Sequence, residues 1–340
     1  MNMVEQMNGT RTDVQIERAT VPVGISESDY RLCVRAALLY YRDGLSQSEI
    51  GARLGYSRIK INRVLGKARS YGILEIRVKV PHGWHVGLET DLVNAFGLRA
   101  AVVVDADPAG ETTKARIAEG AAKWLARHLQ PNMRVGLGIG RTVAHLPETF
   151  RLDQPIDCTF IEVLGAVYTP DWSKFDVTSK MAELAGGTRE ALQAPGFVTN
   201  ADLGVMLINE PSVAAALKRA RESDIIIQSV GPVDTSAILF QSGVLGEGDL
   251  KDLRGRGAVG DALGYYYDIE GVRVESSTDS KLIGVDLDDL RHIDWSVIVA
   301  AGEHKVEPII GGIRGGYFNV LITDESTAES LLANYSRNAQ

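Results

Sequence analysis

The spacing of apolar residues divides the chain into two parts of different character. Between residues 29 and 70, apolar side chains recur every three or four positions, which places them on one face of a helix. Further along, short unbroken apolar runs such as 101–104 and 225–227 alternate with amphipathic segments such as 117–129. Unbroken apolar runs between helices are typical of strands buried on both faces. We therefore expect a small all-α domain followed by a doubly wound α/β domain with a mostly parallel sheet.

Polar residues mark the ends of three short helices in the N-terminal part. Ser46 and Glu49 have the spacing of a capping box at the start of the second helix, and Gly55 can end it in a left-handed turn. Ser57 is placed to cap the third helix. Residues 73–80 then alternate apolar and charged positions, which predicts one short exposed strand, a wing. Two helices joined by a glycine turn are the parts of a helix-turn-helix.

The outward face of the third helix carries side chains that suit DNA. Arginine can donate two hydrogen bonds to guanine, asparagine can pair with adenine, and an aliphatic tip can touch a thymine methyl group. Lysines at the edge of such a face are better placed for phosphates. The alternative is a three-helix bundle with a charged surface. The predicted DNA-binding residues are Ser46, Gln47, Ser57, Arg58, Ile59, Lys60, Asn62, Arg63 and Lys67.

The charge distribution favours the DNA interpretation. Residues 29–79 hold eleven Lys or Arg and four Asp or Glu, a net charge of +7, whereas the whole chain has a net charge of −8. The rest of the chain therefore carries −15. A basic block on an acidic protein suggests one module that binds a polyanion, although a solvated charged face remains the alternative.

Three predicted loops at strand ends could bind a ligand, because open α/β sheets bind ligands at the carboxyl ends of their strands. In the glycine-rich loop 136–142, small residues would let backbone N–H groups approach an anion, Arg141 offers a positive charge and Thr142 offers a hydroxyl. The loop matches neither a P-loop nor a dinucleotide fingerprint. Loop 257–264 offers an aspartate to sugar hydroxyls, and loop 300–305 offers a lysine to a phosphate. The alternatives are tight packing, a turn aspartate and a surface lysine. The candidate effector-binding residues are Gly138, Gly140, Arg141, Thr142, Gly260, Asp261, Gly302, Glu303 and Lys305.

Several of these motifs, in this order, resemble the SorC family of sugar-sensing transcriptional regulators. The resemblance rests on residues 45–58, 61–65 and 68–73 in the N-terminal part, and on 257–261 with 268–271 and 301–305 with 319–325 in the C-terminal part. Four positions depart from the family pattern. Gly51 stands where alanine is usual, Asn62 where serine is usual, Ile139 where tryptophan is usual and Arg141 where threonine is usual.

The resemblance implies a regulator of carbohydrate or polyol catabolism genes that binds operator DNA as a dimer or homotetramer. Its C-terminal domain would resemble sugar-phosphate isomerases in fold and bind a phosphorylated sugar or polyol. Gly140, Arg141 and Thr142 would hold the phosphate with help from Lys305, and Asp261 would face the sugar. The alternative is an isomerase-like enzyme with a DNA-binding appendage. We expect no enzyme, since Asp261 has no second acid or base at convincing spacing.

The sequence also predicts where the domains begin and end. We expect a disordered tail at 1–28, a helix-turn-helix domain at 29–80, a linker helix at 81–97 and the effector domain at 98–340. The N-terminus lacks the apolar core of a signal peptide, and the chain has no run of 18 apolar residues. Cys33 and Cys158 lie in apolar patterns, which fits reduced thiols in a cytoplasmic protein. We expect no cofactor and no metal, because His82 and His85 have no further ligands nearby in the sequence.

Overall fold

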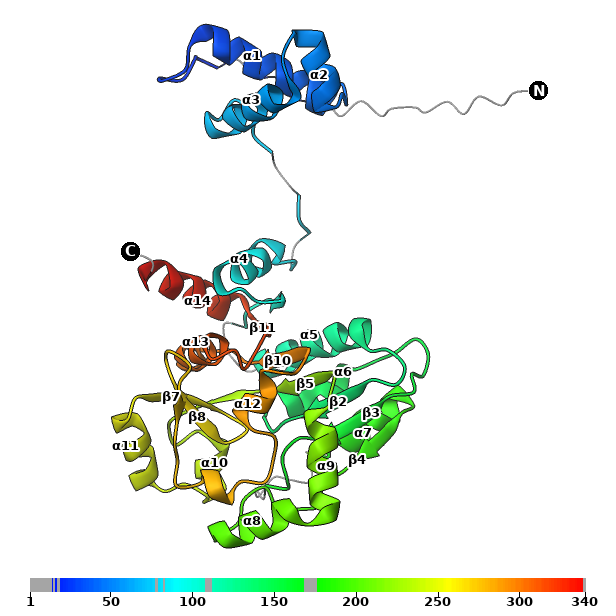
Figure 1. Ribbon diagram of the computed structural model, residues 1–340, viewed down its shortest axis with the longest axis vertical. Coiled ribbons are helices and arrows are strands. Elements are labelled where there is room, and N and C mark those ends of the chain that lie inside the picture. The colour runs from blue at the N-terminus through cyan, green and yellow to red at the C-terminus, as the bar shows by residue number, and fades with distance from the viewer. Residues whose placement is uncertain are drawn as a thin grey trace, which may run out of the picture. The chain divides into compact units, whose positions relative to one another are not determined.

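The computed structural model describes residues 14, 16, 19–76, 79–81, 83–107, 112–167 and 176–338. The chain divides into two compact units, with the boundary between Lys79 and Val80 (Figure 1). In the described residues, no helix is both long and apolar enough to cross a membrane.

The first unit is a cluster of helices around a small apolar core. Its elements are α1 (Glu27–Ala37), a π-helical turn η1 (Leu38–Arg42), α2 (Gln47–Leu54) and α3 (Arg58–Ser70). The predicted capping box is present, since Ser46 and Glu49 each accept a hydrogen bond from the other's backbone N–H. Gly55 ends α2 with φ of +76°. Buried side chains from three helices meet in the core: Cys33, Ala36, Ala37, Ile50, Ile61, Val64, Leu65 and Ala68.

The predicted wing strand at 73–80 is wrong for the residues described there. Residues 73–76 and 79–80 form no strand, while Arg77 and Val78 lie outside the described residues. The backbone N–H of Leu74 donates to the Ala68 carbonyl at 3.0 Å, and Ile73 and Leu74 pack against the helical core. A strand needs a partner for its backbone groups, and the described chain offers none here. At the other end, α1 begins at Glu27 inside the expected tail, most of which lies outside the described residues.

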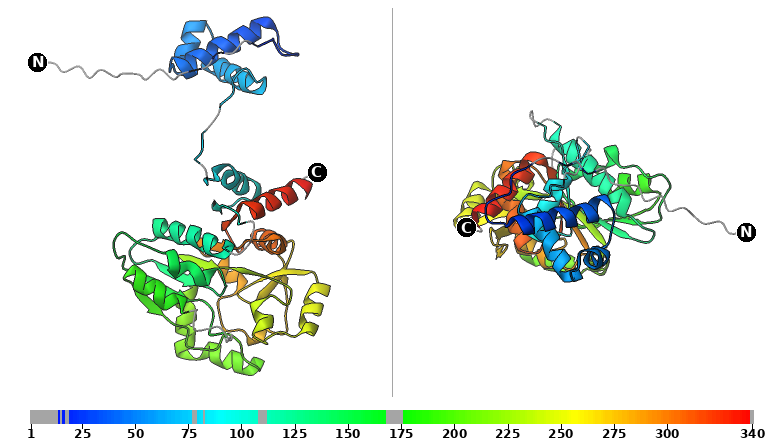
Figure 2. Two further views of the ribbon diagram at one scale, coloured as in Figure 1. Left: turned by 180° about the vertical axis from the view of Figure 1, so that it is seen from behind. Right: turned by 90° about the horizontal axis from the view of Figure 1, so that it is seen from above.

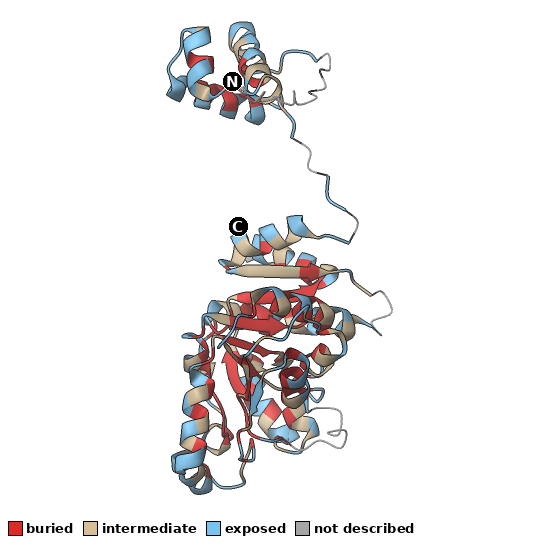
Figure 3. Ribbon diagram, turned by 90° about the vertical axis from the view of Figure 1, so that its right-hand side faces the viewer, coloured by how far each residue is buried: buried red, intermediate tan, exposed pale blue. Residues whose placement is uncertain are grey.

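The second unit is built on a seven-stranded parallel sheet with strand order β1-β11-β10-β5-β2-β3-β4. This arrangement confirms the expected doubly wound α/β fold. Figure 3 shows buried strands inside a shell of partly exposed helices, and the strands buried most completely are the central ones, β5, β10 and β11. The strands are β1 (Ala100–Val104), β2 (Arg134–Leu137), β3 (Thr159–Glu162), β4 (Thr188–Glu190), β5 (Ile225–Gln228), β10 (Trp295–Val299) and β11 (Val320–Asp324).

Helices cover both faces of this sheet. In β5, Ile225 and Ile227 belong to the core cluster that contains residues of α5 and α7, whereas Ile226 belongs to the cluster that contains residues of α13 and α14. The predicted linker helix is α4, which packs against β1 and α14 within the second unit. The longer helices are α4 (Val86–Phe96), α5 (Thr113–His128), α7 (Val177–Ala185), α8 (Ala201–Asn209), α9 (Pro211–Arg221), α13 (Val306–Arg314) and α14 (Glu325–Asn338).

A second, antiparallel sheet was not expected from the sequence. It consists of β6 (Val230–Pro232), β7 (Ala258–Ala262), β8 (Tyr265–Asp268) and β9 (Arg273–Val274), and α11 (Glu247–Gly255) packs against β7. The segment predicted as a ligand loop at 257–264 is therefore mostly strand β7. Short helices connect the other elements: η2 (Val143–His145), α6 (Leu146–Thr149), α10 (Ile238–Gln241), η4 (Asp279–Lys281), α12 (Leu287–Leu290) and η5 (Glu303–Lys305).

Candidate functional site

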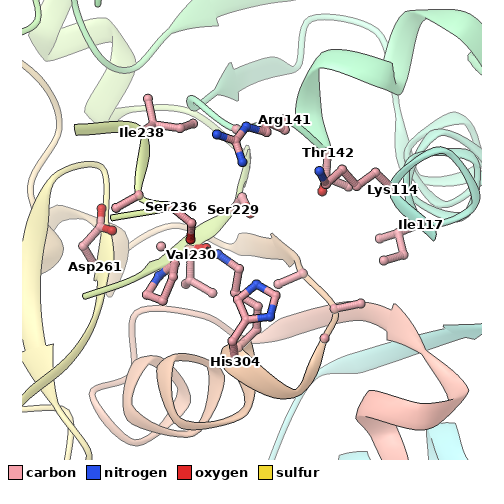
Figure 4. Close-up of a pocket in the computed structure, with 18 of the residues that line it drawn as sticks. Lys114, Ile117, Arg141, Thr142, Ser229, Val230, Ser236, Ile238, Asp261 and His304 are labelled. Carbon is pink, nitrogen blue, oxygen red and sulfur yellow. Dashed lines mark hydrogen bonds between the residues drawn. The ribbon is translucent and has the colours of Figure 1, made fainter. Parts of the chain in front are cut away.

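A cavity of about 460 Å³ opens at the carboxyl ends of the parallel strands. Its wall is formed by residues that follow β1, β2, β5, β10 and β11, and by Asp261 of β7 (Figure 4). Six of the nine candidate effector-binding residues line this cavity: Gly140, Arg141, Thr142, Asp261, Gly302 and Lys305. The fold thus brings together, at the strand ends where ligands bind in such sheets, segments more than 160 residues apart in the sequence.

The loop after β2 forms one wall of the cavity. A Cβ atom at Gly140 would lie 2.7 Å from Cβ of Ser229, so only glycine lets this loop approach the strand end of β5. Thr142 is buried with 7% of its surface exposed, and it lines the cavity. The exposed Arg141 donates a hydrogen bond from Nη2 to the side chain of Gln241. This wall combines a backbone turn, a hydroxyl and a fixed positive charge.

Lys305 and Asp261 face the cavity from the other side. Lys305 Nζ donates a hydrogen bond to the Val230 carbonyl at 2.7 Å. The pKa of Lys305 is lowered to about 8, mainly by burial; the charges of Asp261 and Asp234 oppose this shift, and those of Arg141 and Lys114 add to it. Burial also raises the pKa of Asp261 to about 6, although Lys305 and a hydrogen bond from the Gly264 N–H (3.2 Å) oppose this shift. At neutral pH the cavity therefore holds a desolvated ammonium and a desolvated carboxylate.

The third helix of the first unit presents the predicted DNA-facing side chains to solvent. Ile59 has 68% of its surface exposed. Gln47 Nε2 of α2 donates to Asn62 Oδ1 of α3 at 3.3 Å, so the two helices hold this amide between them. Ser46 and Ser57 cap their helices. The remaining predicted residues, Arg58, Lys60, Arg63 and Lys67, are exposed on α3.

Comparison with known proteins decides the family. The model of a family described as "Putative sugar-binding domain" matches residues 84–333. The transcriptional regulator LsrR of Enterobacter sp. (strain 638) is 31% identical over 331 residues, which cover 95% of this chain and 99% of that protein. The chain belongs to the SorC-type family of sugar-binding transcriptional regulators. LsrR of Escherichia coli O157:H7 is 33% identical over 306 residues, 88% of this chain and 93% of that protein.

A solved structure extends the likeness to the whole SorC-type chain. The full-length sorbitol operon regulator SorC from Klebsiella pneumoniae has a TM-score of 0.70 and 26% sequence identity, and the match covers 90% of this chain and 100% of that one. The helical first unit and the α/β second unit therefore occur together in a solved relative.

Three candidate residues of this SorC-type regulator lie outside the main cavity. Gly138 lines a smaller neighbouring cavity of about 270 Å³, and a Cβ atom there would lie 2.7 Å from Cβ of Gln228. Gly260 lets β7 pass α13, since its Cβ would lie 2.7 Å from Cβ of Pro308. Glu303 is exposed and accepts a hydrogen bond from Ser330 Oγ at 3.0 Å. For these residues, packing and surface contacts explain the position.

Sequence reasoning missed several residues that line the cavity. Lys114 in the first turn of α5 reaches it from the side opposite Asp261, and His304 lies near Lys305 (Figure 4). Burial, followed by the charges of Lys305 and Lys114, lowers the pKa of His304, which keeps its ring neutral above pH 7. Lys114 begins the helix after β1, so its place beyond a strand end was the signal that could have found it. Others offer hydroxyl or carboxylate groups: Asp107, Ser229, Ser236, Asp324 and Ser326. The described residues contain no cluster of three or more His, Cys, Asp or Glu side chains suited to a metal.

Proposed function

We propose that a phosphorylated sugar or polyol binds in the cavity of the second unit and changes how tightly the first unit binds DNA. The observation that carries this proposal is the set of cations around the cavity. Lys114, Arg141 and Lys305 all line it, and none forms an ion pair with a carboxylate of the described residues. Cations that converge on a cavity without an ion pair to a carboxylate favour an anionic ligand.

Another part of the cavity wall suits the neutral part of such a ligand. Asp261 contributes a carboxylate to the cavity wall, and Ser229 and Ser236 add hydroxyl groups. Hydroxyls and carboxylates of this kind bind the alcohol groups of sugars. Gly140, Arg141, Thr142, Lys114 and Lys305 would then take the phosphate.

The exposed face of α3 is the proposed DNA-reading surface. Arg63 and Asn62 have donor and acceptor groups for base edges, and Lys60 and Lys67 are placed for phosphates. One recognition helix covers only a half-site, so we propose that the protein acts as a homodimer or homotetramer. We further propose that it works in the cytoplasm on genes of carbohydrate or polyol catabolism, in keeping with the operon named for the SorC relative.

A thermal-shift screen tests the ligand class. The full-length protein is heated with phosphorylated hexoses, pentoses and polyols, and again with the unphosphorylated compounds. We expect stabilisation by one or more phosphorylated members that is reduced in Thr142→Ala and absent with their unphosphorylated forms. Stabilisation by unphosphorylated sugars alone would contradict the phosphate assignment.

One observation favours an enzyme as the second candidate. Asp261 has a pKa raised to about 6 by burial and lies in the same cavity as a desolvated lysine, which is a pattern found in active sites. The compounds that stabilise the protein should therefore be tested for isomerisation. Turnover that disappears in Asp261→Asn would establish the enzyme; binding without turnover supports the regulator.

A further inference from the structure

The cavity lies against the first turn of α14. Strand β11 ends at Asp324, and both Asp324 and Ser326 line the cavity. Asp324 Oδ1 accepts hydrogen bonds from the Thr327 N–H at 2.9 Å and from Ser326 Oγ at 3.2 Å. The Gly302 N–H, at another point of the cavity wall, donates to Thr327 Oγ1 at 2.8 Å. A ligand that contacts Ser326 therefore contacts the start of α14, and a ligand that contacts Gly302 contacts a residue that is hydrogen-bonded to it.

The residue between Asp324 and Ser326 contacts a histidine outside the cavity. Glu325 Oε1 lies 3.6 Å from Nδ1 of His85, and Asp105 Oδ1 lies 2.9 Å from Nε2 of the same ring. Asp105 and Glu325 each follow one of two neighbouring parallel strands, in which Val104 is paired with Asp324. Only 13% of the His85 side chain is exposed, so the ring is held between these two carboxylates.

Both carboxylates belong to short segments that continue into the cavity wall. Two residues beyond Asp105, Asp107 lines the cavity, and it accepts hydrogen bonds from the N–H and hydroxyl of Thr112 before α5 begins. Glu325 is flanked on both sides by cavity residues. A shift of either segment on ligand binding would therefore move a contact of His85.

His85 is the residue from which α4 begins. Helix α4 packs along β1 and α14, where Leu92 is fully buried and the rings of Phe96 and Tyr335 lie 5.4 Å apart. Figure 2 shows α4 and the red helix α14 side by side in the second unit. On its N-terminal side, α4 is joined through residues 80–84 to the first unit, which ends at Lys79.

We propose that His85 couples the cavity to α4, so that a bound ligand changes the stability of the helix that carries the DNA-binding unit. This inference rests on the proposed function and adds the route of regulation. A ligand can shift such an equilibrium only through contacts that differ between the two states. The contacts that differ are those of Asp105 and Glu325 with His85, while the cavity itself does not include His85.

Hydrogen exchange of the full-length chain tests the coupling, with inorganic phosphate as the probe. At about ten times its dissociation constant, a ligand makes the opening of the segments that it stabilises about tenfold rarer. We expect phosphate to slow exchange in residues 139–145 and in α4 of the wild type. In His85→Ala and Glu325→Gln, the slowing at 139–145 should persist and the slowing in α4 should be lost.

The Glu325→Gln variant keeps the size of the side chain and guards against a general loss of folding in His85→Ala. Its matched control is Glu119→Gln on α5, since Glu119 and Glu325 have 45% and 44% of their side chains exposed and each contacts one basic residue. The control should behave as wild type. Slowing in α4 that survives in Glu325→Gln, or slowing confined to 139–145 in the wild type, would overturn the coupling alone. No slowing at 139–145 would overturn the phosphate site, and the coupling with it.

Discussion

Lys305 should make anion binding by the cavity depend on pH between 7 and 9. Its pKa is lowered to about 8 by burial, so the ammonium is about nine-tenths charged at pH 7 and about one-tenth charged at pH 9. The charged form exists below the pKa and is lost as the pH rises through it. A phosphate that needs this charge should therefore bind about tenfold more weakly at pH 9 than at pH 7.

Neither Asp261, His304 nor the phosphate of the ligand changes its charge much between pH 7 and 9. Asp261, with a pKa of about 6, is already mostly ionised at pH 7, and the pKa of His304 lies below its ordinary value of 6.5. The second pKa of a phosphate monoester is about 6, so the ligand is mostly a dianion throughout. Binding should also draw a proton onto Lys305 near pH 8 and 9, because an anion favours the charged ammonium.

Isothermal titration calorimetry at pH 7, 8 and 9 measures both effects, with two buffers of different ionisation enthalpy to count protons. A charge-assisted hydrogen bond contributes about 1.5–3 kcal/mol, so Lys305→Met should weaken binding at pH 7 by about ten- to a hundredfold and flatten the pH dependence. Lys114→Met is the comparison, since it removes a cavity cation but leaves the titrating group; because Lys114 lowers the pKa of Lys305, this variant should keep a pH dependence that is displaced to higher pH. Equal affinity at pH 7 and 9 in the wild type, or a persistent pH dependence in Lys305→Met, would refute the assignment.

Three further predictions concern other parts of the chain. Arg63→Ala should cost about 1–3 kcal/mol of sequence-specific DNA binding and leave the ligand-induced thermal shift intact, and unchanged affinity for a selected DNA fragment would remove Arg63 from the reading face. Gly51→Ala should destabilise the first unit by about 1–3 kcal/mol in urea unfolding, since its Cβ would lie 2.5 Å from the Tyr56 carbonyl oxygen. Gly66→Ala, with open space around it, should stabilise the same unit by about 0.5–1 kcal/mol. Equal effects of the two substitutions would contradict the packing argument. Burial raises the pKa of the Cys158 thiol to about 11, so it should react with Ellman's reagent at pH 8 only on unfolding; rapid reaction of the native protein would show that the thiol is accessible.

The parallel sheet could be predicted because each buried strand is marked by a short apolar run in its own sequence. Strands such as β5 contain an unbroken apolar run, residues 225–227, and such a run is typical of a strand that is buried on both faces. The candidate phosphate wall at 140–142 could be found for the same reason, since the end of a buried strand is visible in the sequence and the fold brings strand ends together.

The parts that were missed depend on distant contacts. Gly260 and Asp261 lie on a strand because β7 pairs with β6 and β8, and a loop of glycines looks the same until those partners are known. The expected strand at 73–80 shows the reverse case, in which an alternating pattern folds back on its own helix through Leu74. Lys114 follows the strand end of β1, but that it lines the cavity depends on where the first turn of α5 lies once the sheet has formed.

The central claim is that ligand in the cavity changes DNA binding, and one measurement tests it most directly. A DNA fragment is selected from a random pool with the full-length protein, and its dissociation constant is measured by fluorescence anisotropy with and without the phosphorylated compound that gives the largest thermal shift. We expect the compound to change the affinity at least about fivefold, the lower end of ordinary allosteric coupling, and to have no effect in Thr142→Ala at the same concentration. A dissociation constant that does not change when the cavity is saturated would contradict the account.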